Sequence, residues 1–596
     1  MKMTLATLCS NSALVEEIEV CVKGVTRTSV EASRFLNLHL LRALEAGREV
    51  PRMDQTFFYR AFTAVAGATG TGAARDEFGV TLAEYTALRP GGLARFHAAG
   101  VTQMLNYAGK DYMTACQNHV VLNISRRVAK AFKAFFGGLD QNFRAPDRNK
   151  VCAHFMRCAE RTSDVAATAG VWDGLVVRAT HATRNAVEGY ITRTLESYAD
   201  LPLDSKGLGA VARVKTRWWA YLRWLHDLQK DAEARDGRRF SILPLCGFDA
   251  KYVTVDTNVL HGLLGRAAKR GAGPRPPPLA PFREHKREHW ERNFRLSKVE
   301  GRNRRLDFEF MVLSDGYGAS ASMTRTKASV VPWQAAPAPD LIGKRVVSVD
   351  PGRRDLATCS TFGEDGVVTF PRFSNAEYRE KIGSAKASTK RRTWLEGDGL
   401  EAVLELPTAK TSSSAVMRVH ISRLLALIDP ILLHHGARRV RSMRFTQYGR
   451  KQKVMEEICD RIVRGGVSDE DERPVIVAFG AGMFSSCSSG HCPGPVKGVR
   501  KALRRRGEEV HDVNEDYTSQ LCCCCHKRVE PMYGADDSGA IHAVRRCLNT
   551  ECSRTVWNRD VNAALNIHFV FVAEALHGAR PVAFTRAYRT GLARAR

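Results

Sequence analysis

The spacing of apolar residues changes twice along this chain, and each change predicts a new kind of structure. From about Glu31 to Leu228, apolar residues recur at intervals of three and four, as in SRFLNLHLLRALEA and TRWWAYLRWLHDLQK. This period gathers them on one helix face, so the segment predicts a helical domain. The second stretch contains Trp218, Trp219 and Trp224. Aromatic residues at helical spacing indicate a packed core more often than a surface that stacks on bases.

Alternating apolar and polar residues replace the helical pattern from Phe240 to about Thr326. The runs KYVTVDT, LDFEFMVL and, after a turn at Asp315 and Gly316, ASASM predict the strands of a small β domain. A proline-rich loop, GAGPRPPPLAP, and a charged run, REHKREHWERNFR, lie inside this segment. The charged run is equally consistent with a solvated helix face and with a contact to phosphate.

After Pro339, predicted strands alternate with predicted helices. The runs KRVVSVD, VVTF and PVIVAFG and residues 510–513 predict strands, and residues 415–433, 451–463 and 496–505 predict helices. An early strand that ends in Asp350 and a late helix that begins near Asp560 are typical of an RNase H-like α/β nuclease core. The whole chain is therefore expected to be a multidomain α+β protein.

Length, charge and cysteine content narrow the class of protein. The 596 residues exceed a single core, and Lys and Arg outnumber Asp and Glu by 90 to 63, for a formal charge of +27. This excess favours nucleic acid as a partner over an acidic membrane surface or a merely solvated surface. No apolar run predicts a membrane span or a secretory signal. The sixteen cysteines are thus expected to be thiols or metal ligands in a reducing compartment.

Two acidic residues are candidates for a catalytic metal site. Phosphodiester hydrolysis with two Mg²⁺ ions needs carboxylates that converge from separate elements. Asp350 ends a strand before a Pro-Gly turn, and Asp560 lies at the start of a helix in WNRDVNAALNI. A turn-forming residue is the alternative interpretation of Asp350, and a helix cap is the alternative for Asp560.

The strand that should carry a third carboxylate has none. The relevant positions in PVIVAFG are Ala478, Phe479 and Gly480, and the next strand and its end supply three acids, Asp512, Glu515 and Asp516. We expect Glu515 to be the third metal ligand, because it has the necessary reach and because the small Ala478 and Gly480 leave space for it. The alternative is a solvent-facing acid near a strand end.

Four cysteines have the spacing of a metal site. Cys522 and Cys525 are two residues apart, Cys547 and Cys552 are four apart, and 21 residues separate the two pairs. Two such knuckles predict one tetrahedral structural Zn²⁺ site, with His526 as an alternative nitrogen ligand. Three other potential ligands, Cys487, His491 and Cys492, crowd into six residues and favour a plain loop over a second metal site.

Three segments of the C-terminal half carry a family resemblance: VDPG at 349–352, NEDYTSQLCCCC at 514–525 and CSRTVWNRDVNAA at 552–564. Together they resemble the Fanzor family, the eukaryotic relatives of transposon-encoded TnpB nucleases and type V CRISPR effectors. The resemblance implies that Asp350 and Asp560 are the first and last RuvC aspartates and that Glu515 is the glutamate of the site. The chain departs from the family in its CCCC run and in the four residues inside its second knuckle.

The resemblance also implies a domain organisation. A β-barrel-like wedge domain would comprise 1–30 and 236–340, a helical recognition lobe 31–235, a split RuvC-like nuclease domain 341–520 and 553–596, and a zinc-ribbon module that binds target nucleic acid 521–552.

The implied function is RNA-guided cleavage of DNA in the nucleus by a monomeric ribonucleoprotein. The protein would bind a structured guide RNA from its own locus, recognise a short motif beside a double-stranded DNA target, and cleave with two Mg²⁺ ions. The alternatives are a guide-independent RNase H-like nuclease and a transposon-associated DNA-binding protein whose nuclease has decayed. The basic segments 386–392 and 500–506 predict nuclear import signals or contacts to RNA.

Overall fold

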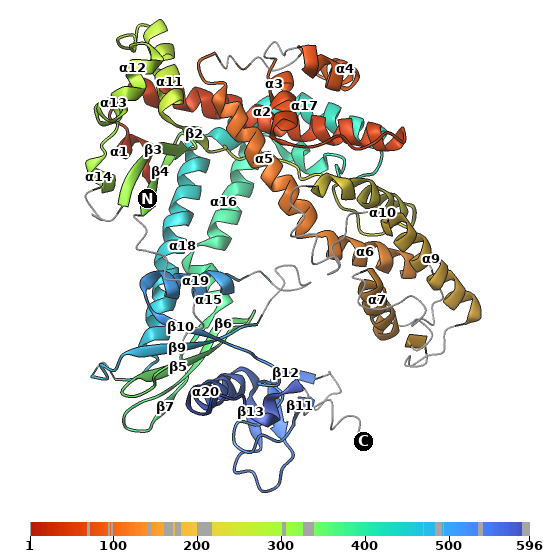
Figure 1. The fold of residues 1–596 in the computed structure, drawn as a ribbon, viewed down its shortest axis with the longest axis vertical. Coiled ribbons are helices and arrows are strands. Elements are labelled where there is room, and N and C mark those ends of the chain that lie inside the picture. The colour runs from red at the N-terminus through yellow and green to blue at the C-terminus, as the bar shows by residue number, and fades with distance from the viewer. Residues whose placement is uncertain are drawn as a thin grey trace. The chain divides into compact units, whose positions relative to one another are not determined.

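The chain folds into two compact units of helices and sheets. The computed structural model describes residues 2–67, 72–92, 96, 99–137, 139, 145–159, 171–172, 180–199, 217–300, 306–325, 339–468, 470–482, 492, 494–533 and 540–586. The first unit comprises Met1–Thr326 and Thr393–Ser442, and the second comprises Lys327–Arg392 and Met443–Arg596 (Figure 1). In the described ranges, no helix combines the length and the apolar character needed to cross a membrane.

A long helix, α2 (Ser12–Glu45), organises the first unit. Asn11 caps it by accepting a hydrogen bond from the Leu14 N–H, and every residue from 28 to 41 is buried. The helices that contact α2 include α3 (Gln55–Val65), α4 (Gly72–Ala87), α5 (Gln103–Val121) and α17 (Ser414–Gly436). The helical part continues through α6 (Ile124–Gly137), α7 (Ala145–Ala159), α9 (His181–Ala199) and α10 (Leu222–Ala234). Trp218 and Trp224 are buried in its core, as predicted.

A four-stranded antiparallel sheet in the same unit has the order β1-β4-β3-β2. Its strands are β1 (Lys2–Thr4), β2 (Val253–Val255), β3 (Leu306–Ser314) and β4 (Gly318–Arg325). The predicted turn between β3 and β4 is confirmed: Asp315 Oδ1 accepts from the N–H groups of Tyr317 and Gly318, and Gly316 has φ +80°. In the described residues β1 and β2 remain free edges, so the sheet is open and the expected barrel-like form is not found.

Short helices pack beside this sheet. They are α1 (Leu5–Leu8), α11 (Thr257–Lys269), α12 (Leu279–Glu284), α13 (Lys286–Asn293) and α14 (Ser297–Glu300). The charged run of the sequence forms α13 and the end of α12, and it presents a solvated face while Trp290 is fully buried in the core.

The second unit is built on a mixed sheet with the order β10-β9-β5-β6-β7 (Figure 1). Its strands are β5 (Arg345–Asp350), β6 (Asp355–Phe362), β7 (Val368–Thr369), β8 (Arg372–Ser374), β9 (Val475–Gly480) and β10 (Glu509–Val513). β6 is antiparallel to β5, whereas β9 is parallel to β5 and β10 is parallel to β9. β8 pairs with β6 beside β7. The central strand β5 therefore ends where Asp350 leaves the sheet.

Helices cover both faces of the mixed sheet. On one face, Val347 and Val349 pack with α18 (Arg438–Arg464) and α19 (Val496–Arg506). On the other face, Val346 and Ile476 pack with α20 (Arg559–His577). Side chains alternate along a strand, so Asp350, which follows Val346 and Ser348 at intervals of two, projects toward the α20 face. Helices α15 (Asn375–Lys381) and α16 (Ser384–Gly397) follow β8.

A small three-stranded antiparallel sheet lies in the sequence between β10 and α20. It comprises β11 (Val529–Tyr533), β12 (Ala540–Cys547) and β13 (Val556–Asn558), in that order. Its core contains Cys522, Val529, Cys547 and Trp557. This arrangement is compatible with the zinc ribbon predicted to interrupt the α/β domain.

Candidate active site and zinc site

Asp350 lies at the end of β5 in a position with little access to solvent. The turn that follows depends on glycine, because a Cβ on Gly352 would lie 2.6 Å from the carbonyl oxygen of Asp355. Burial raises the pKa of Asp350 well above its ordinary value, and the negative charges of Asp560 and Glu515 raise it further. Asp350 therefore interacts electrostatically with both of the other predicted site acids. The positive charge of Arg559 partly offsets their effect on its pKa.

Glu515 reaches this site from the loop after β10. Its Oε1 accepts a hydrogen bond of 3.0 Å from the Gly482 N–H, and burial raises its pKa. A Cβ on Gly480 would lie 2.0 Å from Glu515 Oε1, and a Cβ on Gly482 would lie 2.4 Å from Oε2. The carboxylate thus occupies the space that two side chains would otherwise fill.

The sequence predicts that Ala478 and Gly480 leave space for Glu515, and the structure shows this for Gly480 alone of the two. Gly480 adjoins the carboxylate, whereas Ala478 packs in the core with Ile567. Gly482 was missed, and the signal for it was the second glycine of the run FGAG, directly after the strand.

Asp560 is the second residue of α20 and does not cap the helix. The cap is Asn558, whose Oδ1 accepts from the N–H groups of Asp560 at 3.0 Å and Val561 at 3.1 Å. The carboxylate of Asp560 is left for other contacts, and its charge acts on Asp350 and on Arg545 of β12.

The two neighbouring acids that competed with Glu515 are engaged elsewhere. Asp512 forms ion pairs with Arg500 at 3.0 Å and Arg504 at 3.1 Å. Asp516 forms an ion pair with Arg586 at 2.7 Å. Of the three acids, Glu515 is the one that lies against Gly480 and Gly482.

The three carboxylates offer oxygen ligands of the kind that hard divalent cations prefer. Burial is the largest cause of the raised pKa of Asp350, and the negative charges of Asp560 and Glu515 add to it. In the described residues, only the four cysteines form a group of three or more Cys, His, Asp or Glu ligand atoms within 4.8 Å of one another.

The candidate zinc site comprises the four cysteines predicted from the sequence, Cys522, Cys525, Cys547 and Cys552, with all four sulfurs within 4.8 Å of one another. The Sγ atoms of Cys522 and Cys552 are 3.7 Å apart, and those of Cys525 and Cys547 are 3.6 Å apart. Four Zn–S bonds of about 2.3 Å in a tetrahedron place sulfurs about 3.8 Å apart, so the spacing fits zinc.

The pKa values within the cluster differ: that of Cys522 is lowered, whereas burial raises that of Cys547 to about 12. Burial alone would raise the pKa of Cys522, but hydrogen bonds from the backbone of Cys525 and Cys524 outweigh it and lower this pKa to about 7.

The other potential zinc ligands lie away from this cluster. Cys524 is exposed, and the backbone N–H of Cys523 donates to Asn562 Oδ1 at 2.9 Å. The His526 ring packs on Phe569, with 4.4 Å between ring centroids. Of the possible second site, Cys487 and His491 lie outside the described residues, and Cys492 is exposed.

Two buried asparagines connect the segment just before the four-cysteine cluster to the helix that carries Asp560. Asn562 and Asn566 have no exposed surface, and their Nδ2 groups donate to the carbonyl oxygen of Leu521 at 2.7 Å and 2.8 Å. Asn566 also donates to the carbonyl oxygen of Thr518 at 2.7 Å. The signal that could have found them is their spacing of four in NRDVNAALN, which places two amides on one helix face.

One segment of the C-terminal half is similar to a known protein family. A family model described as the Cas12f1-like TNB domain matches residues 499–567, a span that includes Glu515, the four cysteines and Asp560. A search of curated proteins finds no match.

Among solved structures, two of CasPhi-2 (Cas12j) show similarity, one bound to crRNA and phosphorothioate-DNA and one bound to crRNA. The identity is 14% in both, with coverage of 55% and 54% of this chain and 58% and 61% of those chains. The alignments therefore span less than two thirds of the CasPhi-2 chains. The TM-scores of 0.25 and 0.22 are too low to support a shared fold.

Zinc content tests the assignment of the four cysteines. Cys525→Ser removes one of the four clustered sulfurs, so we expect the purified protein to lose its zinc and to unfold at a lower temperature. Cys524→Ser is the matched control and should keep one zinc per chain, because this thiol is exposed and outside the cluster. Elemental analysis measures both; loss of zinc from Cys524→Ser alone would show that the ligand set is wrong.

Asp350→Asn is expected to raise the melting temperature of the ion-free protein. The folded-state pKa of Asp350 is raised, so its charged form destabilises the fold at neutral pH, and this penalty disappears as the pH falls through the folded-state pKa. Each kcal/mol recovered corresponds to about 2–4 °C. Calorimetry in EDTA at neutral and acidic pH measures the effect, which should shrink at low pH. Asp512→Asn, which loses two ion pairs, should give no rise.

Proposed function

We propose that this chain is an RNA-guided DNA endonuclease of the TnpB and type V class, and within that class a Fanzor. One observation carries the proposal: Glu515 and Asp560 come from separate elements, yet both act electrostatically on Asp350, and a four-cysteine cluster comes from the segment between them in the sequence. The match of residues 499–567 to the Cas12f1-like TNB domain covers two of these acids and all four cysteines, which supports the class.

The nuclease domain is proposed to be RuvC-like, with an RNase H-like fold. The sheet order β7-β6-β5-β9-β10, in which β6 runs antiparallel to its neighbours β5 and β7 while β9 and β10 run parallel to β5, supports this fold. In that fold the first acid is expected at the end of the central strand and the last acid near the start of the final helix, where Asp350 and Asp560 lie. The domain boundaries drawn from the sequence remain part of this proposal.

The three carboxylates would hold two Mg²⁺ ions, which would polarise the phosphodiester and activate the attacking water when bound. The chain itself positions the ligands: β5 fixes Asp350, the Gly482 N–H orients Glu515, and the cap at Asn558 sets the start of α20. Arg559 and Arg545 bring positive charge to the same carboxylates. Their charge would favour an anionic phosphate at the site.

The proposed partners follow from the class and from the net charge of +27. They are a guide RNA from the same locus and a double-stranded DNA target with an adjacent motif, bound by a monomeric ribonucleoprotein in the nucleus. Zinc would be structural and would hold the β11–β13 module, which Asn562 and Asn566 connect to α20. The runner-up is a guide-independent nuclease with the same catalytic residues.

Cleavage assays test the three acids. Glu515→Gln keeps the size of the side chain but weakens its binding of a divalent cation, so we expect Mg²⁺-dependent DNA cleavage to fall at least about a hundredfold. Asp512→Asn and Asp516→Asn are matched controls and should stay within a few-fold of the wild type, because both acids are in ion pairs with arginines. Retained activity in Glu515→Gln with loss in either control would move the third ligand to that residue.

Sequencing of the bound RNA tests guidance separately from cleavage. The protein is purified from cells that express it with its native flanking locus, and RNA that survives a moderate-salt wash is sequenced. A single species with a fixed scaffold and an end at the locus boundary is expected. Only heterogeneous cellular RNA, together with cleavage that needs no added guide, would favour the guide-independent nuclease.

A further inference from the structure

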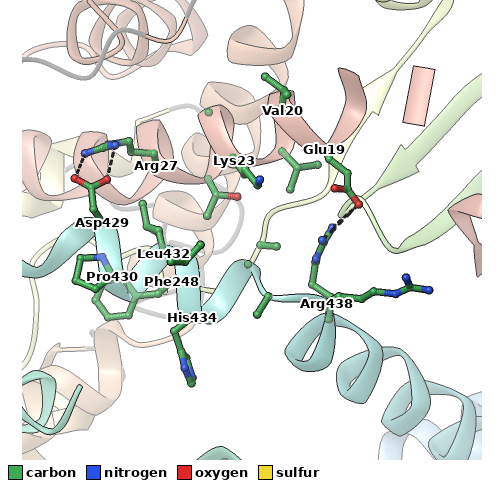
Figure 2. Close-up of a pocket in the computed structure, with 18 of the residues that line it drawn as sticks. Glu19, Val20, Lys23, Arg27, Phe248, Asp429, Pro430, Leu432, His434 and Arg438 are labelled. Atoms are coloured by element: carbon green, nitrogen blue, oxygen red, sulfur yellow. Dashed lines mark hydrogen bonds and ion pairs between the residues drawn. The ribbon is translucent and has the colours of Figure 1, made fainter. Parts of the chain in front are cut away.

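A cavity of about 1140 Å³ lies within the first unit, far in sequence from the catalytic acids (Figure 2). One wall is α2, and the opposite wall is the end of α17 with the start of α18 (Figure 2). Its apolar lining includes Val20, Val22, Phe248, Leu432 and Leu433. Leu433 is 75% exposed, so an apolar surface continues to the mouth of the cavity.

Two phenylalanines, Phe96 and Phe248, line the cavity, and Phe248 contacts two basic side chains. The guanidinium carbon of Arg34 lies 5.3 Å from the centre of the Phe248 ring. Arg34 is itself only 4% exposed and is fixed by hydrogen bonds to the Cys246 carbonyl and to Ser33 Oγ. The ring of His435 is 5.8 Å from that of Phe248. Phe248 is therefore held as a fixed aromatic surface at the cavity wall.

The charges around the cavity are unbalanced. Each acid of the lining already has a basic partner: Glu19 pairs with Arg441, Asp398 with Arg439 and His434, and Asp429 with Arg27 at 2.7 Å. Arg266 and Arg270 share one acidic partner, the buried Glu17, so this group keeps a net positive charge. Lys23 and Arg438 also line the cavity, and both are exposed. Among the described residues neither of them has an ion pair, so both add positive charge that a ligand can meet.

We propose that this cavity binds one unstacked nucleotide of the RNA that the protein carries. The base would lie against Phe248, and the adjoining phosphates would contact Lys23 and Arg438. Three properties favour this ligand: the volume is that of a small-molecule site, the wall is apolar and aromatic, and the excess charge is positive. Proteins read single-stranded RNA by stacking splayed bases on aromatic rings and arginine planes. The inference rests on the proposed function for the presence of RNA.

Binding measurements separate the base contact from the phosphate contacts. The probe is the RNA recovered from the purified complex, transcribed and end-labelled, or a labelled oligouridylate if no single species is recovered. Phe248→Ala should weaken binding about tenfold without changing its salt dependence, because it removes stacking alone. The double variant Lys23→Ala, Arg438→Ala should lower the slope of log K against log salt by about 0.7 for each phosphate that is no longer neutralised.

Matched controls come from the same chain. Lys298→Ala removes an exposed lysine of the first unit that does not line the cavity, and it should leave the slope unchanged. Phe370→Ala removes a phenylalanine that is 38% exposed and also lies outside the cavity, and it should leave affinity unchanged. Lys23 and Arg438 are exposed, so their replacement tests the site even if Phe248→Ala fails to fold.

Photocrosslinking locates the nucleotide directly. RNA labelled with 4-thiouridine in the purified complex should crosslink to the peptide that contains Phe248 after irradiation, digestion and mass spectrometry. Wild-type affinity and slope in the cavity variants, with crosslinks only elsewhere, would overturn the inference even if the RNA is a genuine guide. Recovery of heterogeneous RNA would contradict guidance, while a crosslink at Phe248 would still support the cavity as an RNA site.

Discussion

The contact between α20 and the central strand β5 fixes the position of the helix that carries Asp560 relative to the strand that ends in Asp350. Ser348 Oγ donates to the Ala564 carbonyl at 2.9 Å, and small residues at 563 and 564 let the helix approach the sheet closely. The same helix carries Asp560 as its second residue and, two and six residues later, Asn562 and Asn566, which donate to the carbonyl oxygen of Leu521 just before the first cysteine pair. A single helix therefore contacts the sheet, carries Asp560 and bonds to the backbone just before the four-cysteine cluster.

That arrangement places like charges together in a poorly solvated position. Burial and the charges of Asp560 and Glu515 raise the pKa of Asp350, and the charge of Arg559 partly offsets them. A protein that needed stability alone would place an amide or an apolar side chain there. Electrostatic repulsion among buried carboxylates is typical of cation-binding sites, because a bound cation attracts each of the carboxylates.

The sequence anticipated some of this well, because some features depend on local pattern. Continuous apolar runs predicted β5 and β9, and cysteine spacing predicted the four clustered sulfurs. Strand β6 was missed, because DLATCSTF is rich in small and polar residues and lacks a clear alternation, although it is almost wholly buried. The sequence also did not reveal that the sheet of the first unit is open, because closure of a barrel depends on pairing between strands that are distant in the sequence. The cavity joins segments 19–27 and 429–441, which no local pattern connects.

The glycine pocket around Glu515 has a consequence for how related chains are recognised. The carboxylate of a loop residue fills the volume beside Gly480 and Gly482, so a side chain on either glycine and the glutamate in its present place exclude one another. A side chain at position 480 of the strand and the Glu515 carboxylate therefore compete for the same space. The loop glutamate fits only because the strand has a glycine there. Under the proposed function, a survey that demands an acid on the strand would class this chain as inactive, although the carboxylate of Glu515 fills the space beside that strand position.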